Sequence, residues 1–385
     1  MTGGMRIAIT LALVAATALA LVCVVVLLVK GPAEVLSALG SLLNGIAGSP
    51  TAIGATGKTL TPILLIGTAS CLSFRAGQFD VGQLGQFVLG GVFAGAIAPI
   101  VAAPGPIVIV VALAAGALAG GLWSLLISRA SLVAGVQLVV MSLIANYLAE
   151  GLGRMVTRTL FQDHNTYSVI ATQTISEQAW LPILLPRTNF HSGIIFAFAL
   201  IGLAFVVVKG TVLGHRLTMF GLNPVAAALS GVDARGFQSR LQAATGAICG
   251  LAGAIEVMGH FHRYQDASLG GANSVAWTGV IAAILVSGRV LAVLPAALLL
   301  AALTTGFAGI QRDLGIPSGL GVLMAGLVVI TAAFMAKGGG NRVRPSSGRA
   351  HGKQSANSDE GNGQSSAGEI APAKQQALES GNVSR

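Results

Sequence analysis

Repeated long apolar runs constrain the fold of this chain more than any other feature. They recur along the 385 residues with lengths of roughly 17–25 residues, which an α-helix needs to cross a ~30 Å hydrocarbon layer. Only 9% of the residues are charged, which excludes an ordinary globular enzyme, and a transmembrane barrel would show short alternating segments instead. Abundant glycine suits close helix packing in a membrane. The sequence predicts an all-α, polytopic helical membrane protein.

Hydropathy and the polar segments between the runs place about ten transmembrane helices. The first is expected to remain uncleaved, because its apolar run is too long for a signal peptide. Residues 1–336 are therefore expected to form one transmembrane domain, and the polar segment 337–385 a disordered cytoplasmic tail. The predicted spans are 6–29, 59–74, 84–103, 107–127, 132–149, 193–208, 241–258, 272–286, 290–307 and 319–336.

The formal net charge of +9 indicates membrane orientation rather than nucleic-acid binding. Basic residues gather between spans and in the tail, without interleaved aromatic residues, and the positive-inside rule places both termini in the cytoplasm. The three cysteines, Cys23, Cys71 and Cys249, all fall in apolar runs, so we expect no disulfide framework.

One hydrophilic connection, residues 221–232, has the pattern of a short helix between two spans. Asn223 can cap it and Pro224 suits its first position, where no backbone N–H is needed. Gly231 can end it. A rigid, water-exposed cytoplasmic helix at 223–230 suits a membrane protein that a soluble partner must push. The residues assigned to this coupling role are Gly221, Leu222, Asn223, Pro224, Ala226, Ala227, Ala228 and Gly231.

A second polar segment, near residues 75–86, interrupts the apolar pattern and predicts a broken helix. A charge at the bilayer centre costs roughly 2.5–3.5 kcal/mol on insertion scales, so Arg75 and Asp80 should face protein, water or each other. Irregular backbone at membrane depth is tolerated only where it is packed in protein or lines a cavity. A plain cytoplasmic turn is the alternative. Broken helices of this kind often line transport pathways. The candidate residues for such a transport pathway are Arg75, Phe79, Asp80, Gln83, Gln86 and Asn146.

Other motifs point to no catalysis, metal or cofactor. Asn146 and Glu150 share a helix face, where Asn146 could equally form an interhelical hydrogen bond. Residues 52–59 resemble a loose phosphate-binding loop but lead into a span rather than following a strand. His260 and His262 lie two residues apart, so they do not share a helix face, and no third metal ligand is evident. No nucleophile–base motif occurs, so we expect no enzyme.

Four stretches together resemble a known family. They are 59–65 (TLTPILL) with 74–82 (FRAGQFDVG), 85–90 (GQFVLG), 221–224 (GLNP) with Ala226, Ala227 and Gly231, and 279–285 (GVIAAIL) with 294–299 (LPAALL). This combination resembles the permease subunits of bacterial ABC importers for simple sugars, nucleosides and branched-chain amino acids. The nucleoside (basic membrane protein-type) permeases are the most similar group.

The resemblance implies a function and a set of partners. Such a permease has no ATPase site of its own and lies in the bacterial plasma membrane. A second permease subunit, often non-identical, shares the pathway, cytoplasmic ABC ATPase subunits receive the helix at 223–230, and an external solute-binding protein delivers the solute. Asp80 stands where the family often has Asn, and Val225 replaces a frequent Glu. These departures affect the substrate assignment, not the class.

Three alternatives stay open at this stage. An ion-coupled secondary transporter would use a carboxylate at the bilayer midplane, for which Asp80 is the candidate. A branched-chain amino acid ABC permease would have the same scaffold with another solute. A membrane scaffold without transport is disfavoured, because it needs no irregular backbone within the bilayer.

Overall fold

Helices joined by short turns and loops make up the part of the chain that the computed structural model describes, residues 3–163, 169–229, 231, 233–271, 274–316 and 326. Only isolated β-bridges accompany them there, for example between Gln162 and Thr172. The all-helical prediction is confirmed. The span expected at 319–336 and the tail at 337–385 lie outside the described residues.

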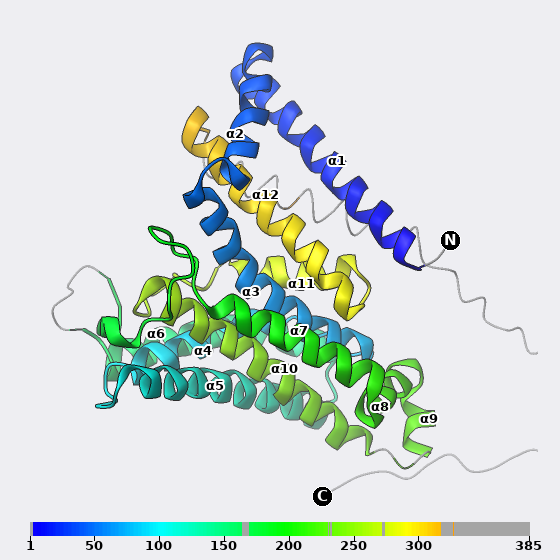
Figure 1. The fold of residues 1–385 in the computed structure, drawn as a ribbon. Coiled ribbons are helices and arrows are strands. Elements are labelled where there is room, and N and C mark those ends of the chain that lie inside the picture. The colour runs from blue at the N-terminus through cyan, green and yellow to red at the C-terminus, as the bar shows by residue number, and fades with distance from the viewer. Residues whose placement is uncertain are drawn as a thin grey trace, which may run out of the picture. The chain divides into compact units, whose positions relative to one another are not determined.

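The helices follow one another along the chain with few long connections (Figure 1). Their bounds are α1 (Gly3–Lys30), α2 (Val35–Ala47), α3 (Pro50–Arg75), α4 (Gln83–Ile97), α5 (Gly105–Ala134), α6 (Leu138–Leu160), α7 (Gly193–Gly210), α8 (Val212–Leu222), α9 (Pro224–Leu229), α10 (Ala234–Glu256), α11 (Val275–Leu285) and α12 (Val293–Leu314). A π-helical turn, Val257–Phe261, extends α10.

Among the described residues, five helical segments are long and apolar enough to cross a membrane. They are Ile7–Lys30, Gly105–Ala134, Gly193–Gly210, Ala234–Phe261 and Val290–Leu314. This confirms a polytopic membrane protein, while the count of about ten spans stays a prediction. The span expected at 272–286 is shorter than predicted, because α11 has only 11 residues, about 16 Å of helix.

Close packing of glycines holds α4, α5 and α10 together. Gly246 and Gly250 on α10 face Gly116 and Gly120 on α5, and a Cβ at Gly250 would overlap the carbonyl oxygen of Gly116. Such small-residue seams let helix backbones approach in a membrane, where apolar side chains gain little by leaving lipid. The many glycines of the sequence therefore act here as packing surfaces.

The first helix contacts the bundle along one stripe only. Its fully buried residues recur at every fourth position, at Val14, Ala18, Val22 and Val26, whereas large apolar residues such as Leu28 (79% exposed) face outward. A stripe of this spacing is one face of a helix. The outward apolar face is suited to lipid.

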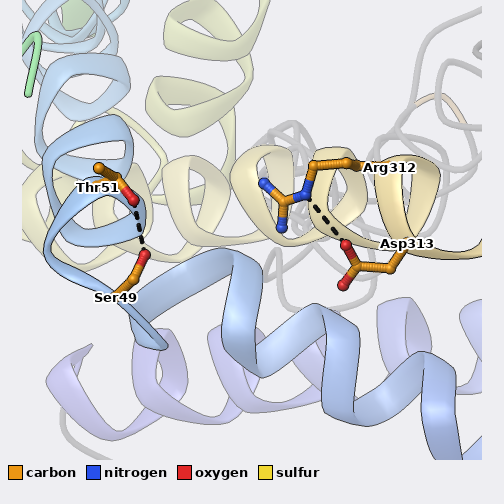
Figure 2. Close-up of polar contacts among 4 residues, drawn as sticks. All are labelled: Ser49, Thr51, Arg312 and Asp313. Carbon is orange, nitrogen blue, oxygen red and sulfur yellow. Dashed lines mark hydrogen bonds and ion pairs between the residues drawn. The ribbon is translucent and has the colours of Figure 1, made fainter.

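Polar contacts lie near the N-terminus of α3 and near the C-terminus of α12 (Figure 2). The Ser49 hydroxyl accepts a hydrogen bond from the Ala52 amide at 3.1 Å and lies 2.8 Å from the Thr51 hydroxyl. Arg312 pairs with its neighbour Asp313 at 3.1 Å. Residues 52–59 are thus regular α-helix within α3, not a phosphate-binding loop.

Several boundaries differ from the sequence-based expectation. The span expected at 132–149 is wrong at its start, because α5 runs to Ala134, Gly135 adopts a left-handed conformation with φ 65°, and α6 begins only at Leu138. Helix α6 continues to Leu160, beyond the predicted end of this span at residue 149. Helices α2 and α8 were not predicted from the sequence at all.

Candidate functional site

The connection between α7 and α10 folds into two helices, α8 and α9, that meet at Asn223. We call this junction, with α8 on one side and α9 on the other, the elbow. Helix α8 ends at Leu222, Asn223 is extended (φ −156°, ψ 99°), and α9 begins at Pro224. The Asn223 side-chain oxygen accepts a hydrogen bond from the Ala226 amide at 3.1 Å, which is the capping expected from the sequence. Gly231 follows with φ 84°. The short helix is confirmed at 224–229, and its coupling role stays a prediction.

One side of this elbow is anchored and the other is open. Ala227 is buried in a small apolar cluster with Ala76, Leu217 and Phe220. In contrast, the side chains of Leu222 and Leu229 are 79% and 86% exposed. These exposed apolar side chains leave this side of the elbow open to contact with another molecule. The structure describes Gly221 and Pro224 at this elbow, whereas the side chain of Ala228 lies outside the described part.

The break between α3 and α4 covers residues 76–82. Helix α3 ends at Arg75, Gly77 has φ 69°, and α4 starts at Gln83. The irregular segment is therefore shorter than expected, because Gln83 and Gln86 lie in the first turn of α4. Glycine at position 77 is required by its left-handed conformation, which other residues adopt at a cost.

Asp80 is the centre of a buried hydrogen-bond network at this break. Its side chain is 2% exposed. One carboxylate oxygen accepts from the Gly82 amide at 2.8 Å and the other from the Gln86 amide nitrogen at 3.1 Å. The Gln83 side chain donates to the Asp80 carbonyl oxygen at 3.0 Å. No basic side chain pairs with Asp80 among the described residues, so hydrogen bonds alone compensate its burial.

The network reaches two further helices, α5 and α10. Gln86 donates to the Ser124 hydroxyl of α5 at 3.1 Å, and the Ser124 hydroxyl donates to the side-chain oxygen of Gln242 on α10 at 3.5 Å. Gln242 in turn donates to Gln78 at 3.4 Å, which returns to the break. We call Gln78, Asp80, Gln86, Ser124 and Gln242 the Asp80 network. It joins α4, α5 and α10 to the irregular segment.

Asn146 ties the same region to α6. Its side-chain oxygen accepts from the Gly85 amide at 2.9 Å and its nitrogen donates to the Val81 carbonyl at 2.8 Å. The first bond joins α6 to α4, so Asn146 forms the interhelical hydrogen bond that was the alternative for this residue, and the second joins α6 to the break. Glu150, one turn on, accepts from the Gly271 amide at 2.8 Å.

Space beside the Asp80 network is small in this conformation. A cavity of about 10 Å³ adjoins it, which is about the room that one water molecule needs. A nucleoside or a sugar could not enter without movement of the helices. The cavity lining comprises Asp80, Gly82, Gln86, Trp123, Ser124, Ile127, Leu138, Ser142, Ala145 and Gln242.

Two of the expected pathway residues lie apart from this network. The Arg75 guanidinium donates to the Thr218 hydroxyl of α8 at 3.1 Å, so it faces the elbow rather than Asp80. Phe79 is 50% exposed and stacks on Phe74, with 4.7 Å between ring centroids. The structure therefore brings together Asp80, Gln83, Gln86 and Asn146, and places Arg75 and Phe79 at its edge.

A second polar cluster, which the sequence analysis did not assemble, lies at the opposite ends of α3 and α10. The Lys58 ammonium is 3.0 Å from a ring nitrogen of His260, and Trp180 stacks on His262 with centroids 3.7 Å apart. His191 is fully buried, and burial together with the positive charge of Lys58 lowers its pKa to about 4. These residues lie far apart in the sequence, so no local motif predicts that they form a cluster. None of the described residues form a three-ligand group able to hold a metal.

Comparison with known proteins identifies the family. A family model described as "Branched-chain amino acid transport system / permease component" matches residues 55–333. The chain is 29% identical over 313 residues to the guanosine ABC transporter permease protein NupP of Bacillus subtilis, covering 80% of this chain and 88% of that protein. It is 27% identical over 305 residues to the nucleoside ABC transporter permease protein NupB of Lactococcus lactis, covering 75% and 79%.

A third relative is named for a different substrate, glucose. The glucose ABC transporter permease protein TsgB13 of Haloferax volcanii is 26% identical over 279 residues, covering 70% of this chain and 72% of that protein. No solved structure gives a significant match. The family resemblance of the sequence motifs is confirmed. The chain belongs to the branched-chain amino acid transport system permease family, as a non-catalytic, multi-pass component of an ABC transporter in the cell membrane.

Proposed function

We propose that this chain forms the translocation pathway of an ATP-driven importer for a small polar solute. The first candidate for this solute is a nucleoside. The observation that carries the proposal is the capped helix α9, which leaves the apolar bundle with Leu222 and Leu229 exposed beside it. Two relatives are named guanosine and nucleoside ABC transporter permeases. A simple sugar is the second candidate, because a third relative is named a glucose ABC transporter permease.

In this proposal α9 docks on a cytoplasmic ABC ATPase subunit. ATP binding would move α9, and the membrane helices would change between two arrangements that open to opposite sides of the membrane. A second, non-identical permease subunit completes the pathway, and an external solute-binding protein delivers the solute. Both chain termini then lie in the cytoplasm.

Asp80, Gln83, Gln86 and Asn146 lie beside the proposed pathway. Their polar groups sit at a helix break, where irregular backbone is tolerated only in protein or beside water. The adjacent cavity of about 10 Å³ holds no more than about one water. A solute can therefore pass directly beside these residues only after α4 separates from α5 or α10.

An ion-coupled transporter is the competing function, and one observation favours it. Asp80 is a buried carboxylate with no basic partner among the described residues, as expected of a proton-carrying site. Uptake that collapses with an uncoupler while ATP is maintained would support it. Uptake that follows ATP alone would support the importer.

Charged substitutions on the open side of the elbow test the proposal. Because Ala227 is 1% exposed, a charge there would disturb folding, so we place glutamates at Leu222 and Leu229. The double variant Leu222→Glu, Leu229→Glu should reach the membrane normally, lose the co-purifying ATPase, and fail to take up labelled guanosine. Ala134→Glu, an exposed alanine at the end of α5, is the control that should keep both.

The same assay identifies the solute. Uptake of labelled guanosine that unlabelled glucose does not inhibit supports a nucleoside permease. Uptake of labelled glucose that unlabelled guanosine does not inhibit supports a sugar permease. If the Leu222→Glu, Leu229→Glu variant keeps its ATPase and its uptake, α9 is not the docking helix and this assignment is wrong.

A further inference from the structure

We propose that Gly221 is a positioning residue that transmits the movement of α9 to the Asp80 network. The contact runs from the end of α8 to residues 75–77 at the end of α3. This inference rests on the proposed coupling role of α9. It adds the route by which docking on one side of the elbow reaches the buried polar residues.

Backbone meets backbone at this contact. A Cβ added at Gly221 would overlap the Arg75 carbonyl oxygen, and a Cβ added at Gly77 would lie 3.3 Å from the Gly221 carbonyl oxygen. No side chain separates the two segments, so neither can absorb a displacement by changing rotamer. A shift of α8 therefore has to move residues 75–77 with it.

Two further contacts hold the same two segments together. Arg75 donates to the Thr218 hydroxyl, one turn before Gly221, at 3.1 Å. Ala76 is 1% exposed and packs with Leu217, Phe220 and Ala227. The elbow and the end of α3 are thus joined by backbone packing, a charged hydrogen bond and a small apolar cluster, which together make one rigid unit.

Both chain directions from α9 lead to the Asp80 network. Through Gly221 the route enters residues 75–77 and continues directly to Gln78 and Asp80. In the other direction α9 is followed by α10, whose Gln242 donates to Gln78 at 3.4 Å. A displacement of α9 would therefore act on this network from two sides, and the backbone break at 76–82 is the part able to change conformation.

A cysteine reporter on the break tests this route in the assembled transporter. The three native cysteines, Cys23, Cys71 and Cys249, are replaced by alanine, and Phe79→Cys places a half-exposed thiol on the segment. Its rate of maleimide labelling is compared without nucleotide and with ATP and vanadate. We expect a change of about fivefold or more, the low end of measured coupling between sites.

The variant Gly221→Ala is then added to the reporter. Its Cβ forces the elbow away from the Arg75 carbonyl, so the nucleotide effect on labelling should disappear while the ATPase subunits still co-purify. Gly210→Ala is the control, because nothing lies within 4 Å of a Cβ at that position. It should leave the nucleotide effect unchanged.

Three other outcomes overturn the inference. If Gly221→Ala keeps the nucleotide effect, the contact does not transmit movement. If it loses the ATPase subunits, the contact serves docking rather than transmission. If the reporter shows no nucleotide effect although the ATPase is bound, the break does not follow α9. Absence of any ATPase from the reporter and from the Gly210→Ala control would instead refute the proposed function itself.

Discussion

Replacing Asp80 separates the role of its hydrogen bonds from the role of its charge. In Asp80→Asn the remaining carbonyl oxygen can still accept from the Gly82 amide. The new amide group can donate to the Gln86 side-chain oxygen, which has no partner among the described residues, once the Gln86 amide rotates. In Asp80→Leu the Gly82 amide loses its acceptor, and the Gln86 side-chain amide loses one of its two acceptors and keeps Ser124. A buried group left unpaired costs about 1–3 kcal/mol, so we expect Asp80→Leu to destabilise the protein by about 1–3 kcal/mol from the Gly82 amide alone.

The assay combines thermal unfolding of the purified transporter with ATP-dependent uptake in proteoliposomes. We expect Asp80→Asn to unfold near the wild-type temperature and to keep most of its uptake. We expect Asp80→Leu to unfold at a lower temperature and to lose its uptake. Asp313→Asn, on an exposed carboxylate that forms an ion pair with its neighbour Arg312, controls for the chemical change. If Asp80→Asn is as damaging as Asp80→Leu, the charge itself is required, and the hydrogen-bond argument fails in favour of ion coupling.

Three other predictions follow from single contacts. Gly250→Val should prevent assembly of α5 with α10, since a Cβ there overlaps a backbone carbonyl, whereas Gly202→Val has open space; membrane expression of the two variants checks this. Because the pKa of His191 falls from 6.5 to about 4 on folding, stability should decrease as pH falls from about 6.5 to 4, by up to about 3 kcal/mol. The variant His191→Gln should lack this contribution and keep the separate one from His260, a second partly buried imidazole, as measured by unfolding at several pH values. Asn223→Ala should weaken the α9 cap by about 0.5–2 kcal/mol, seen as faster amide exchange at Ala226.

The membrane architecture could be predicted because hydropathy is a local property. Apolar length identified α1, α5, α7, α10 and α12, and the cap signals of Asn223 and Pro224 located α9 within one residue. The start of α6 could not be found, because Gly135 breaks the helix inside an apolar run. Helix α2 was missed because a short helix buried against α12 has no membrane-length signature.

The site could be predicted only in part. Residue type and position marked Asp80, Gln86 and Asn146 as polar groups at membrane depth, and the structure gathers them. The direction of Arg75 toward Thr218 could not be read from the sequence, since it depends on how α8, an unpredicted helix, packs on α3. The Lys58–His260 contact joins residues far apart in the chain, and only the folded bundle brings them together.

Affinity purification of the tagged chain from membranes in mild detergent, followed by mass spectrometry, decides whether this chain is the permease of an ATP-driven importer. Such a permease should be recovered with an ABC ATPase subunit and with a second, non-identical permease. Reproducible recovery of the chain without any ATPase, even after crosslinking, would rule out this function and would support an ion-coupled transporter with Asp80 at its centre.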